Sequence, residues 1–128
     1  MAVKVNLAQQ FGRLDDYWSP RTVAVVNDYD VNVLKVQGEF VWHQHDATDE
    51  LVLVTAGRLR IHLQDHDDVV LSAGELFVGP RGMRHWPVAD EETRLVFLWP
   101  RATVNPGDAP GPAGTSSPGQ PRGAGSTP

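Results

Sequence analysis

Turn-forming residues recur at short intervals after Phe40, and this spacing constrains the fold more than any other feature of the chain. Intervals of about 8 to 12 residues between turns are typical of the short strands of an all-β sandwich or barrel. No long helical pattern separates the segments, which argues against a parallel α/β sheet. The turn signals lie at residues 46–49, 56–57, 65–68, 72–74 and 80–83.

Apolar and polar residues alternate within these segments, as they do in strands with one buried face. The apolar positions that we expect to face the core are Leu59, Ile61 and Leu63 in one segment and Leu95, Phe97 and Trp99 in the last. Residues 23–26 and 31–36 are predicted to form two further strands, joined by a turn.

A short helix is predicted at residues 6 to about 14. Asn6 can cap its first turn. Leu7, Phe11 and Leu14 fall on one face at helical spacing.

The last part of the chain has a different composition. Half of the residues at 105–128 are glycine or proline, and no large apolar residue follows Val104. Such a segment cannot bury enough surface to offset the entropy lost on ordering. We therefore expect one domain at residues 1–104, with its core at 23–100, and a disordered tail at 105–128.

Composition excludes several classes of protein. The 128 residues include no cysteine, which excludes a disulfide scaffold, a thiolate metal site and a cysteine nucleophile. The formal net charge is −5 without a basic stripe, which argues against nucleic acid or an anionic membrane as partner. No apolar run approaches the length of a membrane span, and the start of the chain lacks the apolar stretch of a signal peptide, so we expect a cytoplasmic protein.

Four residues are candidate metal ligands: His43, His45, Glu50 and His85. Residues two apart on a strand point to the same face, so His43 and His45 are expected to aim their rings the same way. Glu50 opens the next apolar run, and we prefer it over the neighbouring Asp49. Three imidazoles and one carboxylate suit zinc, nickel, manganese or iron(II), and such a cation would offset the cost of burying Glu50.

The spacing of these residues resembles the two motifs of the cupin superfamily over about residues 23–100. The first motif is matched by Gly38, His43, His45, Glu50 and Gly57, and the second by Gly74, Pro80, Gly82 and His85. Ala89 stands where the second motif has asparagine, which is not a metal ligand in the family. The resemblance implies an all-β jelly-roll barrel, a metal held by the four candidate ligands and a homodimer. The whole chain is similar to small single-domain cupins labelled mannose-6-phosphate isomerase-like.

Other charged residues near the motifs are weaker candidates. Glu39 shares the parity of His43 and would point into the cavity as an acid/base group, or lie in water at the end of its strand. Lys35 is a further candidate of the same kind. Arg81 and Arg84 would clamp a phosphate or carboxylate at the barrel mouth, or be solvated.

Three hypotheses for function follow. The first is an isomerase or tautomerase of a sugar or sugar acid, with the metal as Lewis acid. The second is an iron(II) dioxygenase, and the third is a non-catalytic protein that binds a metal or a small polar molecule. A second acid/base pair would favour the isomerase, a mostly apolar cavity the dioxygenase, and a filled or tiny cavity the binding protein.

Overall fold

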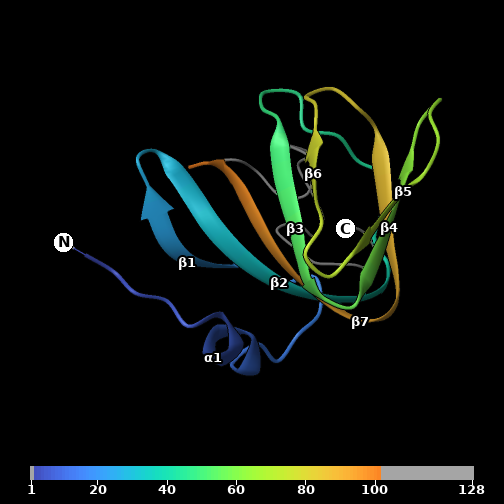
Figure 1. Cartoon of the computed structure of the whole chain (residues 1–128). Coiled ribbons are helices and arrows are strands. Elements are labelled where there is room, and N and C mark those ends of the chain that lie inside the picture. The colour runs from blue at the N-terminus through green and yellow to red at the C-terminus, as the bar shows by residue number, and fades with distance from the viewer. Residues whose placement is uncertain (1, 102–128) are drawn as a thin grey trace.

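The computed structural model describes residues 2–101, and most of this part forms antiparallel strands (Figure 1). The predicted all-β jelly-roll barrel is confirmed, whereas the tail predicted at 105–128 lies outside the described residues. No helix in the described part has the length and apolar character needed to span a bilayer. In chain order the elements are α1 (Leu7–Gly12), β1 (Arg21–Val26), β2 (Tyr29–Glu39), β3 (Glu50–Ala56), β4 (Arg58–Leu63), β5 (Val69–Ser72), β6 (Leu76–Gly79) and β7 (His85–Pro100).

The long strand β7 connects the two sides of the barrel (Figure 1). Its second half lies between β2 and β3, where Val96 is paired with Val33 on one side and Leu53 on the other. Its first half pairs with β4, where Pro87 lies opposite Ile61. β5 pairs with β4. Through its pairing with β4, β7 therefore joins these two strands to the rest of the sheet.

The main core lies inside this barrel and contains the apolar sets that the alternation predicted. Leu59 and Ile61 are buried there, and Leu63 packs against them half-buried. The buried residues of this cluster are Val36, Val52, Val54, Leu59, Ile61, Leu71, Ala89, Leu95, Phe97 and Trp99.

The N-terminal helix is shorter than the predicted residues 6–14, since it ends at Gly12. The side chain of Asn6 accepts a hydrogen bond from the Gln9 amide at 3.0 Å, as expected of the cap. Phe11 and Leu14 form a second cluster with Val33 and Val96. α1 therefore covers a part of the sheet that is separate from the barrel core.

The four motif glycines all have positive φ angles, and all but Gly38 lie at the predicted turns; they are Gly38, Gly57, Gly74 and Gly82. At Gly57 the requirement is strictest, since the backbone of Glu92 and Thr93 lies against its Cα.

Candidate metal centre

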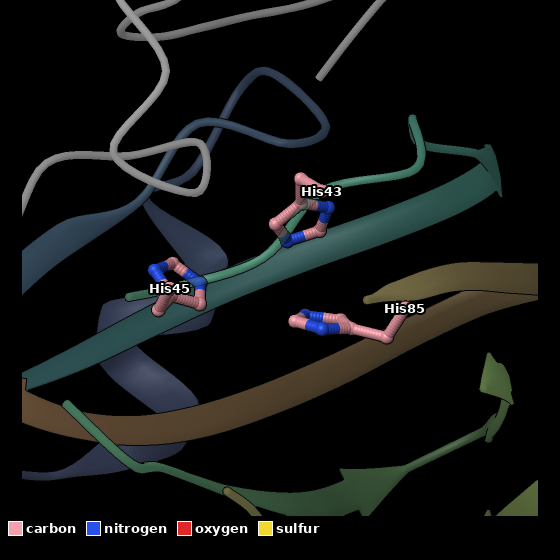
Figure 2. Close-up of side chains that lie close together, drawn as sticks. All are labelled: His43, His45 and His85. Atoms are coloured by element: carbon pink, nitrogen blue, oxygen red, sulfur yellow. The ribbon is translucent and has the colours of Figure 1, made fainter. Parts of the chain in front are cut away.

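Three histidines from two segments meet at one end of the barrel core (Figure 2). His43 and His45 lie between β2 and β3 in a segment that is not a regular strand, contrary to the expectation, and His85 begins β7. The backbones of His43 and His85 pair directly, since the His43 amide donates to the His85 carbonyl at 2.9 Å and the His85 amide donates back at 2.8 Å. With His45, they offer ligand atoms that all lie within 4.8 Å of one another. The three histidines could therefore hold a metal ion.

Glu50 brings a carboxylate to the same place. Its Oε1 lies 3.6 Å from His45 Nε2 and 3.7 Å from His85 Nε2. Two atoms that each lie about 2.1 Å from a shared ion at a tetrahedral angle are about 3.4 Å apart, so these distances fit a common cation. Asp49 is turned toward the loop instead, since its Oδ1 accepts a hydrogen bond from the Arg81 amide at 2.9 Å. The four predicted ligands thus lie together, and the role of Glu50 as a ligand stays a prediction.

Hydrogen bonds at Nδ1 set the tautomers of the His43 and His85 rings. His43 Nδ1 lies 2.8 Å from the Val41 carbonyl, and His85 Nδ1 lies 3.0 Å from the Met83 carbonyl. A carbonyl can only accept, so each Nδ1 carries the hydrogen and each Nε2 keeps its lone pair. Metal-binding histidines are held in this way, and the two residues fit a divalent ion.

The electrostatics of the site also favour a cation. Burial lowers the pKa of His43 well below its ordinary 6.5, and the neighbouring His85 and His45 lower it further. Burial also lowers the pKa of His85, against the opposing effect of Glu50. Burial raises the pKa of Glu50, while His85 partly opposes the rise. Neutral imidazoles are the form that binds a metal, and a cation would stabilise the buried carboxylate.

The metal-free protein is expected to lose stability as the pH falls through 6.5. His43 and His85 have folded-state pKa values below that of the unfolded chain, so the unfolded state binds more protons in this window. Each such proton contributes up to about 1.4 kcal/mol per pH unit. Glu50 acts in the opposite direction, because its raised pKa lowers stability as the pH rises above 4.5.

Urea unfolding of chelator-treated protein between about pH 5 and pH 8 measures this dependence. The matched variant carries His43→Gln and His85→Gln, which removes both imidazoles. Its stability should fall less on the acid side than that of the wild type. Equal slopes for the two proteins would contradict the prediction.

A cavity of about 70 Å³ opens beside the histidines. His43, Glu50 and His85 are the polar residues in its lining, and the remaining lining residues are apolar or aromatic. A volume of this size has room for a few water molecules or part of a small ligand. The cavity is therefore small and largely apolar, and its polar groups are those of His43, Glu50 and His85.

Glu39 and Lys35 do not line this cavity, contrary to the parity argument. The pairing of β2 with β7 shifts register between Val36 and Gly38, and β2 ends at Glu39, so strand parity cannot be carried back from His43. Glu39 is exposed. Lys35 lies between the inward residues Leu34 and Val36. A catalytic role for either residue stays a prediction without support from this placement.

The two candidate arginines also lie outside the cavity lining. Arg81 Nε is 3.6 Å from Asp49 Oδ1, and the Arg84 guanidinium lies 5.7 Å from the centre of the Trp42 ring. Trp42 is exposed and its ring is 5.7 Å from that of Trp86. The two tryptophans therefore contact each other outside the cavity lining.

Sequence reasoning missed several cavity residues, of which Trp18 is the most distant in sequence from the motifs. Trp18, between α1 and β1, lines the cavity and stacks on Phe40 with 4.9 Å between ring centres. Its segment is irregular, so no alternation or motif spacing indicates its direction. Only the packing of that segment against β2 brings the ring to the site.

Comparisons with known proteins agree with the fold and the motifs. Residues 31–101 match the family model described as "Cupin domain". A curated relative, "Uncharacterized protein YdbB" of Bacillus subtilis (strain 168), is 36% identical over 64 residues, which cover 50% of this chain and 57% of that protein. The chain thus spans little more than half the length of that relative.

Solved structures give the same picture. A cupin-2 domain containing protein from Shewanella frigidimarina is 42% identical, with a TM-score of 0.73 over 76% of this chain and 94% of that chain. KdgF from Halomonas sp. is 28% identical, with a TM-score of 0.56 over 64% and 77% of the two chains. Hydroquinone 1,2-dioxygenase from Sphingomonas sp. TTNP3, solved with 4-hydroxybenzoate bound, is 22% identical, with a TM-score of 0.69 over 74% and 31%. The last likeness concerns the fold alone.

Proposed function

Because the chain belongs to the cupin domain family, we propose that it is a metal-dependent enzyme acting on a small, largely apolar molecule. In this proposal His43, His45, Glu50 and His85 hold one divalent ion. Part of the substrate enters the adjoining cavity and presents an oxygen atom to the polar end. The apolar lining of the cavity is the observation that carries the proposal.

The lining favours oxygenation over sugar chemistry. Each sugar hydroxyl that enters an apolar cavity without a partner costs about 1–3 kcal/mol, and the lining offers polar groups at the metal ligands alone. A planar molecule with one or two hydroxyls would instead bury its ring against the aromatic walls. Bound iron(II) would supply the redox chemistry of a dioxygenase. The side chains would orient the ring and exclude water.

The second candidate is the isomerase or tautomerase expected from the sequence, and one observation favours it. Glu50 lines the cavity, and burial raises the pKa of its carboxyl toward the range in which a group can both take and give a proton. If Glu50 is free of the metal, it could move a proton on a sugar or sugar acid. Zinc, nickel or manganese would then serve as well as iron, because polarising a carbonyl needs no redox change.

Two assays on the same protein separate these functions. Metal-free protein is loaded with iron(II) or zinc and offered phenols, catechols and hydroquinones in air, and aldoses, ketoses and keto-acid sugars in D₂O without oxygen. We expect oxygen uptake with the iron form and an aromatic diol, and none with zinc. The His85→Ala protein is the control and is expected to be inactive.

The other outcomes each identify an alternative. Deuterium exchange into a sugar under anaerobic conditions, supported by zinc, would overturn the dioxygenase in favour of the isomerase. A bound metal with no activity in either assay would favour the binding protein, which the small cavity also suits. The homodimer and the cytoplasmic location stay predictions.

A further inference from the structure

The backbone of Trp18 adopts a conformation that bulky residues rarely take. Its φ angle is 61°, in the left-handed region. Among the described residues, the other non-glycine residues with positive φ are Asn27 and Asp65, whose short polar side chains tolerate it. A tryptophan held there is strained, so the surrounding contacts must stabilise it.

Those contacts hold Trp18 by both its backbone and its ring. The Trp18 amide donates to the Lys35 carbonyl at 2.9 Å, and the indole Nε1 donates to the Gln37 carbonyl at 3.0 Å. Both acceptors belong to β2. The ring position is therefore fixed by the strand rather than left to the irregular segment that carries Trp18.

The ring continues an aromatic wall that reaches the metal ligands. Trp18 stacks on Phe40 with 11° between the ring planes, and Phe40 meets His43 edge-on at 5.1 Å between ring centres. All three residues line the cavity. The two rings add aromatic surface to the lining, which suits an aromatic ligand.

Trp18 lies outside the part of the chain that the family model matches. That match begins at residue 31, and Trp18 is the one described lining residue that precedes it. The metal ligands and most of the cavity belong to the barrel, whereas this part of the wall comes from the segment between α1 and β1. The size of the cavity can therefore be set separately from the metal site.

We propose that Trp18 is a specificity-determining residue that restricts the cavity to ligands with a single small planar ring. The inference rests on the proposed function, since it assigns a substrate class to the same cavity. Phe40 is anchored in the barrel beside His43, while Trp18 extends the wall beyond it. Without the indole, a ligand with a second ring would have room to extend past Phe40.

The test compares phenol with 4-phenylphenol by calorimetry, using both metal-free and zinc-loaded protein. The main variant is Trp18→Gly, because glycine adopts a positive φ without strain and the variant is expected to fold. We expect the ratio of the phenol Kd to the 4-phenylphenol Kd to rise at least about tenfold, since burying a second ring is worth that much or more. A smaller rise would overturn the proposal.

Two further variants complete the design. Trp18→Phe keeps an aromatic ring at the position and is expected to raise the ratio less than Trp18→Gly. It also tests the proposal if the glycine variant does not fold. Trp42→Ala is the matched control, since this tryptophan is 40% exposed and does not line the cavity. If the ratio of the two Kd values rises as much in Trp42→Ala as in Trp18→Gly, the proposal is overturned.

Failure of the Trp18 proposal can be distinguished from failure of the proposed function. Elemental analysis of the wild type decides whether the site holds a metal. The ratio in metal-free protein decides the role of Trp18 whatever that analysis gives.

Discussion

Replacement of His85 by alanine is expected to weaken metal binding at least about a hundredfold, or about 2.7 kcal/mol, while the barrel stays folded. The change removes one of three clustered imidazoles, and Nε2 of His85 lies 3.7 Å from the Glu50 carboxylate. His85 belongs to neither apolar cluster, so its loss leaves the core intact. Titration against a competing chelator gives the affinity, and thermal unfolding of the metal-free proteins tests the fold.

The matched control is His62→Ala. His62 lies on β4, 2.9 Å from the Asp68 carboxylate and beside Trp86, outside the histidine cluster. Its removal is expected to leave metal affinity unchanged. Equal losses in the two variants would contradict the site assignment, and loss of fold together with metal in His85→Ala would identify a structural site instead.

The metal centre could be predicted from the sequence because motif spacing and the regular strand β3 indicate its residues. Glu50 shares the parity of Val52 and Val54, and β3 is regular from its first residue, so the carboxylate reaches the interior. Gly82, three residues before His85, lies in the turn signal at 80–83 and has a positive φ angle, and its amide donates to the His45 carbonyl at 2.7 Å. Strand periodicity and turn chemistry therefore explain the placement of Glu50 and His85. His43 and His45 lie in an irregular segment with an isolated bridge at His43, where only the motif spacing indicated them.

The parts that could not be predicted depend on local departures from that geometry. The inward direction assigned to Glu39 assumed an unbroken strand to His43, and the irregularity near Gly38 removes that assumption. Trp18 reaches the cavity through a strained backbone and two hydrogen bonds to β2, which no spacing reveals. The shape of the cavity, unlike its metal ligands, is thus set by contacts between segments that carry no periodic pattern.

Gly57→Ala is expected to destabilise the fold by about 3–5 kcal/mol, more than conformation alone would cause. A methyl group on Gly57 would meet the Glu92 carbonyl oxygen and the Thr93 Cα at 2.8 Å each, as well as the Thr93 hydroxyl. Backbone atoms cannot rotate away as a side chain does, so β7 would have to move. The Thr93 hydroxyl accepts from the Arg58 amide and donates to the Arg58 carbonyl, both at 3.0 Å, and this buried link would be strained.

Gly74→Ala provides the matched control for this effect. Gly74 has a φ of 90°, against 89° for Gly57, but a methyl group there meets no atom within 4 Å. Gly74→Ala should lower the free energy of unfolding only by the cost of holding alanine at a positive φ angle, about 1–2 kcal/mol. Denaturant unfolding of both metal-free variants gives the difference, which we expect to be about 2 kcal/mol or more. Equal losses would mean that β7 yields easily at Thr93, and that the tight approach of the β3–β4 turn to β7 does not stabilise the barrel.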